Sequence, residues 1–247
     1  MKPKNLTLGV LGGMGPAATA EFLMILAKMA PAECDQEHPR MIVYSHTVTP
    51  DRTAFLLGGG ADPYPYLKEG LEKLIDWGAD ILVVTCNTAH YFIDQFREKL
   101  SVPLIHIVEE TIERAAELSP EGAWLAATLG TMRTGLYQRY ADKMKYKLYI
   151  PMENVQTEIH HATDLVKQGK QSEAGCCFAP IITELWAEKK LPVIGACTEI
   201  PISYRNGGLP EDMLISSLDA LAEAAIKELY FGEISDRMRS TFTIFTP

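Results

Sequence analysis

Two stretches of the sequence share a pattern that constrains the fold more than any other feature does. Residues 83–90 read VVTCNTAH, and residues 193–201 read VIGACTEIP. In both stretches an apolar run ends at a cysteine, Cys86 or Cys197, and hydrogen-bonding residues and then a helical pattern follow. A short apolar strand that passes through polar residues into a helix is typical of a parallel α/β sheet. The chain therefore carries this strand–cysteine–helix unit twice.

Alternating strand and helix patterns surround both units. In the first half we predict strands at 6–11, 41–45, 81–85 and 102–107, and helices at 17–29 and 89–100. In the second half we predict strands at 123–127, 146–150 and 191–195, and helices at 132–144, 153–168, 173–189 and 218–231. A turn follows the first strand of each half, GGMGP at 12–16 and TLGT at 128–131. Parallel sheets bind ligands beyond the carboxyl ends of their strands, where these turns and the cysteines fall.

These patterns predict an α/β fold of two pseudo-symmetric lobes, each a parallel sheet flanked by helices, with the active site in the cleft between them. We expect the first lobe to comprise residues 1–107 and the second lobe residues 108–213, with a crossover helix at 108–118. A C-terminal helix within residues 214–232 is expected to return to the first lobe. Residues 233–247 form a tail to which we assign no role.

The charge and the cysteine content exclude several classes of partner and site. A net charge of −9 with no Lys/Arg cluster disfavours nucleic acid and anionic membrane, which both require a basic surface. No apolar run approaches the ~20 residues that span a bilayer, and the N-terminal residues show no leader pattern, so we expect a cytoplasmic protein. The five cysteines lack metal-ligand spacing, which indicates reduced thiols and no metal site. Cys34, Cys176 and Cys177 are predicted to be small core residues.

The two cysteines of the repeated unit can form a pair of acid/base groups if they face each other across the cleft. A free cysteine titrates near ~8.5, so its thiolate needs the stabilisation that a helix start and nearby amides provide. Cys86 and Cys197 both lie at such strand-to-helix junctions. Two groups that flank one carbon can remove a proton from one face and return a proton to the other, which a single base cannot do.

Four motifs together resemble the aspartate/glutamate racemase superfamily, and most closely its aspartate racemase branch. They are LGGMGP at 11–16, PDRT at 50–53, CNTAH at 86–90 and GACTEIP at 195–201. The resemblance extends in order over roughly residues 6–230. It implies an amino-acid racemase without a cofactor, with an acidic amino acid as its small-molecule substrate and a homodimer as its assembly.

The resemblance also implies which residues bind and convert the substrate. Cys86 and Cys197 correspond to the two catalytic thiols of the family. The positions that correspond to substrate-binding residues are Met14, Arg52, Asn87, Thr88, Thr131, Lys167 and Thr198. Arg52 matches an arginine that contacts a side-chain carboxylate, for which its bidentate fork is suited. The neutral donors among them suit the charge that develops on the α-carboxylate when the α-proton leaves.

Other roles stay open for several of these residues. Asn87 and Thr88 can cap a helix, and a lysine such as Lys167 suits the C-terminal end of a helix. Glu199 can either tune Cys197 as a neighbouring carboxylate or cap the helix that follows.

The predicted function is interconversion of L- and D-aspartate, or of glutamate, by two-base proton transfer between Cys86 and Cys197. The chain departs from the family pattern at two places. Its first turn lacks the Asp-Ser-Gly motif of cell-wall glutamate racemases, and Ser45-His46-Thr47 replaces the Asn-Asn-Pro run that aspartate racemases often carry. The alternatives are therefore another amino-acid racemase, a maleate-type dicarboxylate isomerase, or a small-molecule-binding protein of the same fold without catalysis.

Overall fold

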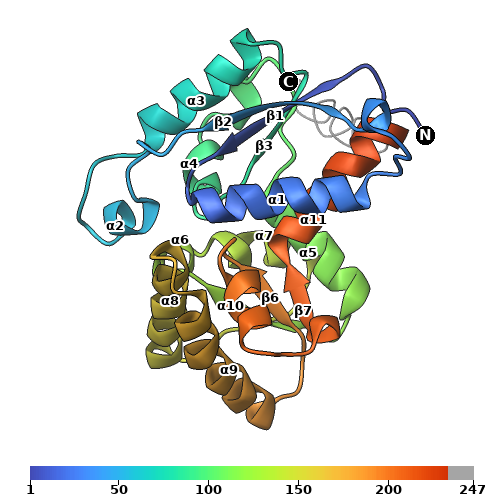
Figure 1. Cartoon of the computed structure of the whole chain (residues 1–247). Helices are drawn as coiled ribbons and strands as arrows, with labels where there is room; N and C mark the ends of the chain where they lie inside the picture. Colours follow the sequence, from blue (N-terminus) through green and yellow to red (C-terminus); the bar gives the residue numbers. More distant parts are fainter. Residues whose placement is uncertain (233–247) are drawn as a thin grey trace.

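The computed structural model describes residues 1–232 and contains two parallel β-sheets, one in each half of the chain (Figure 1). The first sheet has the strand order β2-β1-β3, and the second has the order β5-β4-β6-β7. The predicted α/β fold of two lobes, each a parallel sheet flanked by helices, is confirmed. The tail predicted at 233–247 lies outside the described residues. Within 1–232, no helix combines the length and the apolar character needed to cross a bilayer.

The first lobe is organised around β1, a strand buried along most of its length that pairs with β2 on one side and β3 on the other. The elements of the lobe are β1 (Thr7–Gly12), α1 (Pro16–Met29), β2 (Arg40–Ser45), α2 (Arg52–Leu56), α3 (Tyr64–Asp76), β3 (Ile81–Val84) and α4 (His90–Ile93), with 3₁₀ turns at Asp35–Glu37 and Arg97–Lys99. The apolar runs of β1 and β3 are typical of parallel strands that are buried on both faces. Pro16 begins α1 because its fixed φ suits the first helical turn.

The second lobe repeats this plan around β4. Its elements are β4 (Ala123–Ala127), α6 (Leu129–Thr134), α7 (Leu136–Met144), β5 (Leu148–Tyr149), α8 (Glu153–Lys167), α9 (Gln171–Glu188), β6 (Val193–Ala196), α10 (Ile200–Asn206) and β7 (Leu214–Ser216), with a 3₁₀ turn at Glu211–Met213. In the first lobe β1 pairs with β3, and in the second β4 pairs with β6. Since all these strands are parallel, the first turn and the cysteine loop of each lobe leave the sheet side by side.

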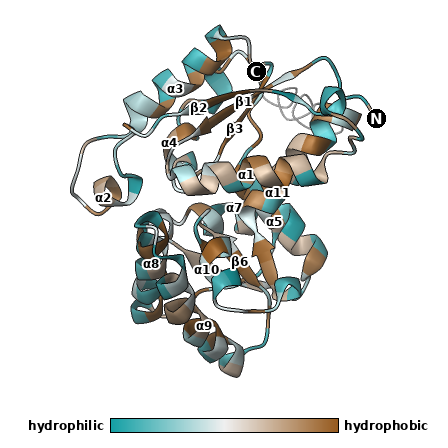
Figure 2. Cartoon of the chain, viewed as in Figure 1, coloured by the Kyte–Doolittle hydropathy of each residue, from teal (hydrophilic) through white to brown (hydrophobic). Residues whose placement is uncertain are grey.

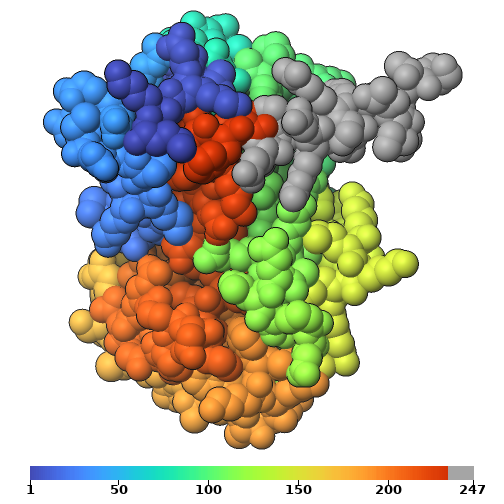
Figure 3. All heavy atoms as spheres, turned by 90° about the vertical axis from the view of Figure 1, so that its right-hand side faces the viewer, coloured from blue at the N-terminus to red at the C-terminus, as the bar shows by residue number. Residues whose placement is uncertain are grey.

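Helices α5 (Ile107–Leu118) and α11 (Ser217–Ile226) lie between the lobes. Helix α11 packs against both α1 and α5, and the π-helical turn Lys227–Phe231 extends it. The backbone N–H of Lys4 donates to the carbonyl oxygen of Leu229 (2.7 Å), so the end of the described chain lies beside its start, as Figure 3 shows.

One apolar core joins the two sheets. A continuous buried cluster includes Leu8 of β1, Phe22 of α1, Leu125 of β4 and Leu221 of α11. Figure 2 shows the apolar strands inside both lobes and the polar helix faces turned outward. Because apolar burial is the main favourable contribution to folding, this shared core determines how the lobes sit relative to each other.

The C-terminal segment that returns to the first lobe begins later than expected. Residues 214–216 form β7, which pairs with β6 in the second sheet, and the return toward the first lobe begins at α11. The division into lobes at 1–107 and 108–213 stays a prediction.

Three predicted elements differ from the structure. The strand predicted at 102–107 is reduced to a bridge between Leu82 and Leu104, because Pro103 cannot donate a backbone hydrogen bond to a ladder. The helix predicted at 89–100 is limited to α4. The helix predicted at 132–144 begins earlier, at α6, and is interrupted at Gly135, whose φ of 61° lies in the left-handed region.

The prediction that Cys34, Cys176 and Cys177 are core residues is wrong, since all three are exposed. Helix α9 buries Gly175 and Phe178 among others, and the helical period of 3.6 residues turns the two intervening cysteines toward solvent. Adjacent cysteines on an amphipathic helix therefore carried no information on burial without the phase of that helix.

Candidate active site

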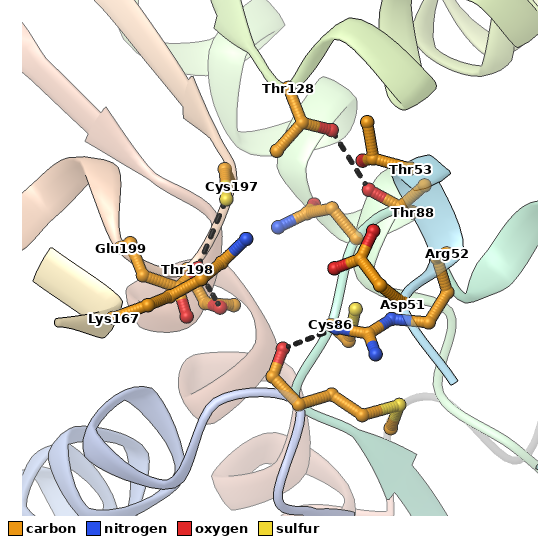
Figure 4. Close-up of a pocket in the computed structure, with 12 residues that line it drawn as sticks. Asp51, Arg52, Thr53, Cys86, Thr88, Thr128, Lys167, Cys197, Thr198 and Glu199 are labelled. Carbon is orange, nitrogen blue, oxygen red and sulfur yellow. Dashed lines mark hydrogen bonds between the residues drawn. The ribbon is translucent and has the colours of Figure 1, made fainter. Parts of the chain in front are cut away.

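A pocket lies between the carboxyl ends of the two sheets (Figure 4). The first lobe contributes Met14, Asp51, Arg52, Thr53, Cys86, Asn87 and Thr88 to its lining. The second lobe contributes Thr128, Lys167, Cys197, Thr198 and Glu199. All of the predicted site residues except Thr131 therefore line one pocket.

Cys86 follows the end of β3 in a loop that several buried groups hold in place. Thr85 in this loop contacts the hydroxyl of Thr19 (3.1 Å), which also accepts from Gly13 N–H (3.0 Å). His90 Nδ1 donates to the carbonyl oxygen of Cys86 (2.8 Å). Burial and the neighbouring His106 hold the pKa of His90 well below its usual value, so this imidazole is neutral. The cysteine loop and the glycine-rich turn are thereby tied to each other.

Arg52, the first residue of α2, is a buried cation beside Cys86 (Figure 4). Its guanidinium donates to the carbonyl oxygens of Met14 (3.0 Å) and Pro50 (3.0 Å), while its Nε has no hydrogen-bond partner among the described residues. Burial alone would lower the pKa of Arg52, but interactions with Cys86 and Asp51 outweigh burial and raise it. Arg52 is therefore a fixed positive charge at the Cys86 side of the pocket.

Cys197 follows the end of β6, and its surroundings differ from those of Cys86. Its Sγ donates to Oε2 of Glu199 (3.0 Å), to which the hydroxyl of Thr198 also donates (3.1 Å). The other carboxylate oxygen, Oε1, accepts from the backbone N–H of Gly15 in the first lobe (3.3 Å). Burial and the Glu199 charge raise the pKa of Cys197 well above its usual value. Cys197 therefore holds its proton in this arrangement.

The geometry favours one of the two roles considered for Glu199. Glu199 occupies the N-cap position of α10, yet its side chain makes no capping hydrogen bond to the helix. Its carboxylate instead accepts from the Cys197 thiol. A role as a tuning carboxylate is thus supported over a role as a cap.

Lys167 lies at the end of α8, and its amino group reaches into the pocket (Figure 4). Burial alone would lower the pKa of Lys167, but electrostatic interactions with Cys197 and Glu199 raise it. The Lys167 charge in turn opposes the rise in the pKa of Cys197. Lys167 therefore interacts electrostatically with Cys197 and Glu199, in addition to lying at the C-terminal end of α8.

Asn87 and Thr88 do not cap α4, which begins at His90 without a side-chain cap. The amide of Asn87 instead bonds to two buried hydroxyl groups, those of Tyr137 and Ser217. Both residues therefore have tertiary partners in place of a helix-capping role.

Thr88 belongs to a cluster of three threonine hydroxyls that crosses between the lobes. Its Oγ1 lies 3.0 Å from that of Thr128 and 2.8 Å from that of Thr131. Thr131 is fully buried behind the pocket, where it supports Thr88. Thr128, and not Thr131, lines the pocket.

Three lining residues were not predicted from the sequence: Asp51, Thr53 and Thr128. The first two flank Arg52 in the PDRT motif, and that adjacency was the signal that could have identified them. Thr128 could have been found from the correspondence of the two first turns. Its side chain also caps α6 by accepting from the backbone N–H of Thr131 (3.2 Å).

The divergent segment Ser45-His46-Thr47 does not line the pocket. His46 is buried behind the glycine-rich turn, where its backbone N–H donates to Gly12 O (3.1 Å) and its ring stacks on Tyr44 at 4.7 Å. The residues that depart from the family pattern therefore do not belong to the pocket lining.

The pocket contains the groups needed for acid/base chemistry on a small anion. It combines two thiols from different lobes, two cations and several neutral donors. Within residues 1–232, no group of three or more His, Cys, Asp or Glu side chains is arranged to hold a metal ion.

Comparisons with known proteins identify a family match over most of the chain. A family model described as Asp/Glu/Hydantoin racemase matches residues 11–225. The chain is 29% identical over 203 residues to the Broad specificity amino-acid racemase RacX of Bacillus subtilis (strain 168), covering 78% of this chain and 85% of that protein.

Solved structures show the same architecture. The aspartate racemase of Picrophilus torridus is similar with a TM-score of 0.78 and 25% identity, covering 91% of this chain and 94% of that one. An aspartate racemase homologue from Pyrococcus horikoshii OT3 shares the fold with a TM-score of 0.70 and 18% identity, covering 90% of this chain and 97% of that one.

We expect that Glu199→Gln increases the rate at which iodoacetamide alkylates Cys197 at neutral pH. The Glu199 charge disfavours the thiolate, so removing it lowers the pKa of Cys197 and raises the thiolate fraction at any pH below that pKa. Each unit of decrease gives about tenfold more thiolate of about threefold lower nucleophilicity, a net gain of about threefold. Mass spectrometry of the Cys197 peptide over time measures the rate.

The matched control is Glu184→Gln, which removes an exposed carboxylate from α9 and should leave this rate unchanged. An equal or slower rate in Glu199→Gln would show that the carboxylate does not control the thiol.

Proposed function

Because the chain belongs to the Asp/Glu/hydantoin racemase family and is an amino-acid racemase, we propose that it interconverts L- and D-aspartate by moving a proton between Cys86 and Cys197 without a cofactor. The observation that carries the proposal is that two cysteines from different lobes line the same pocket. Membership of a racemase family argues against the alternative of a binding protein without catalysis.

The surroundings of the two thiols support different roles for them. Cys197 keeps its proton beside Glu199, and Cys86 lies beside the Arg52 cation, so in one direction of the reaction we assign the role of acid to Cys197 and the role of base to Cys86. The Cys86 thiolate takes the α-proton from one face of the substrate and becomes a thiol. The electron pair left on the α-carbon is delocalised into the α-carboxylate. The Cys197 thiol then gives its proton to the opposite face and becomes a thiolate, and the other enantiomer reacts by the reverse steps.

The charge that develops on the substrate α-carboxylate requires donors that are already in place. The Asn87 amide uses one N–H for Ser217 and has a second N–H available to the pocket that it lines. The Thr198 hydroxyl donates its only proton to Glu199, so its oxygen is suited to accept from the substrate ammonium group. The Lys167 charge offsets the second negative charge that forms when Cys197 loses its proton beside Glu199.

The side chain of the substrate is assigned from the remaining charged groups. Arg52 and Lys167 are cations that suit a second carboxylate, and the chain is similar to the aspartate racemase of Picrophilus torridus. The second candidate is racemisation of a wider set of amino acids, glutamate included. Asp51 favours it, since this carboxylate also lines the pocket and suits a cationic group, as does the similarity to a broad-specificity racemase. A maleate-type isomerase has no specific observation in its favour.

We also propose a homodimer that acts in the cytoplasm. The edge strand β2 exposes Met41 and Val43, which are 39% and 41% accessible, and an apolar sheet edge is a template for pairing with a second copy. All five cysteines are free thiols, which is typical of a reducing compartment. Fractionation of cells that make the natural protein tests the compartment, and recovery outside the cytoplasmic fraction would contradict it.

We expect Cys86→Ser and Cys197→Ser each to lower the rate of α-proton exchange by about 100-fold or more, since loss of a positioned acid or base typically has this effect. The measurement is deuterium incorporation from D₂O at the α-carbon of L- and D-aspartate, followed by NMR or mass spectrometry. Cys176→Ser, on the exposed face of α9, is the matched control and should exchange normally. Exchange that survives both active-site substitutions would contradict the two-thiol mechanism.

We expect Lys167→Met to lower kcat/KM for aspartate about tenfold more than it lowers kcat/KM for alanine, because only aspartate loses a charge-assisted hydrogen bond to its side chain. Any effect through Cys197 is common to both substrates and cancels in the ratio. Lys170→Met, an exposed lysine beyond the end of the same helix, is the control. An unchanged ratio would place the substrate side chain elsewhere and favour the broad-specificity candidate.

We expect sedimentation equilibrium to give roughly twice the 27.4 kDa mass of one chain. Val43→Glu introduces a charge at the exposed edge of β2 and should shift the protein to the monomer. Thr183→Glu, on the exposed face of α9, should leave the mass unchanged. A wild-type monomer would refute the proposed assembly, and a Val43→Glu dimer would refute the proposed surface.

A further inference from the structure

The amide of Asn87 is held from behind by two side chains that do not line the pocket. The hydroxyl of Tyr137, in α7, donates to Oδ1 of Asn87 (2.6 Å). Nδ2 of Asn87 donates to the hydroxyl oxygen of Ser217, the first residue of α11 (2.9 Å). Tyr137 and Ser217 are fully buried, and Asn87 is 2% accessible. Both amide atoms are therefore bonded to groups that come from outside the first lobe's own sheet.

An asparagine side chain is chemically asymmetric, so its orientation decides what it offers a ligand. An amide oxygen turned toward the pocket would repel a carboxylate, whereas an amide N–H would bind one. Burial raises the pKa of Tyr137 far above its ordinary value, so the phenol keeps its proton and remains a donor. In the structure Oδ1 accepts from the Tyr137 phenol and Nδ2 donates to Ser217, so Oδ1 is engaged by α7 and Nδ2 keeps one N–H that Ser217 does not use.

We propose that Tyr137 and Ser217 are positioning residues that hold the Asn87 amide with one N–H directed at the α-carboxylate of the substrate. This inference rests on the proposed function, because it requires a bound amino acid whose α-carboxylate gains negative charge. Neither residue touches the substrate. They act through Asn87 by restraining its amide in the orientation that these two hydrogen bonds define.

The proposal makes the Cys86 loop depend on contacts outside its own sheet for its chemistry. Asn87 is oriented by α7 and α11, and Thr88 by the hydroxyls of Thr128 and Thr131. Cys86 is thus followed by two residues whose polar groups are bonded across the lobe boundary. A donor that is already in place stabilises the α-carboxylate most in the transition state, where negative charge develops on it. Loss of this donor should therefore lower kcat more than it changes KM.

The test is Tyr137→Phe, which keeps the ring in the core and removes only the hydroxyl. We expect kcat for exchange of the aspartate α-proton to fall about tenfold and KM to change by less than about threefold. Tyr140→Phe is the matched control, because it lies one turn further along α7 and its buried hydroxyl donates to Asp94 (2.8 Å), away from the pocket. The control should lose comparable thermal stability and keep its kcat.

A double-mutant cycle separates positioning from a general loss of stability. In an Asn87→Ala background, Tyr137→Phe should change kcat by less than about twofold, since the amide through which it acts is gone. Ser217→Ala removes the second partner of the amide and should also lower kcat, and it decides the question if Tyr137→Phe does not fold.

Each result bears on the inference in a defined way. Equal kcat values for Tyr137→Phe and Tyr140→Phe, or a full tenfold loss that persists in the Asn87→Ala background, would overturn it. An unchanged kcat in Ser217→Ala would overturn the part played by Ser217. A wild-type protein that exchanges no α-proton of any amino acid would refute the proposed function itself, which the wild-type assay shows separately.

Discussion

The structure depends on the burial of α5 and α11 between two parallel sheets. Their apolar residues belong to a cluster that also contains Leu8 and Leu125, one from the central strand of each sheet. Because this core is continuous, the carboxyl ends of the strands of both lobes meet at one place. Cys86 and Cys197, which follow strands of different sheets, line the same pocket for that reason.

Contacts across the pocket join the two lobes in a reciprocal way. The loop after Cys86 bonds through Thr88 to the first turn of the second lobe, at Thr128. The loop after Cys197 bonds through Glu199 to the first turn of the first lobe, at Gly15. The same topology thus carries two different sets of groups, hydroxyls on one side and a carboxylate on the other. Low accessibility strengthens both sets of interactions, since water does not compete for them.

The parts of this fold that depend on local pattern could be predicted from the sequence. Apolar runs identified the buried strands, and the cysteines that follow two of them line the pocket. The helix predicted at 89–100 failed because Phe92 and Phe96 repeat with helical spacing while the chain beyond α4 packs as turns into the same core. Tyr137 and Ser217 could not be found from the sequence, because the role proposed for them depends on hydrogen bonds to Asn87 that form only when the lobes meet.

The unlike neighbours of the two thiols have a thermodynamic consequence for a racemase. Mirror-image amino acids have the same free energy in water, so the equilibrium constant of their interconversion is one. The ratio of kcat to KM must then be identical for both enantiomers, whatever surrounds each sulfur. Under the proposed two-thiol mechanism, the contrast between Arg52 beside Cys86 and Glu199 beside Cys197 can therefore change kcat and KM only together. The enantiomer that binds more tightly also turns over more slowly. Divergence of the duplicated lobes therefore alters kcat and KM in each direction, while the equilibrium ratio of the two enantiomers stays at one.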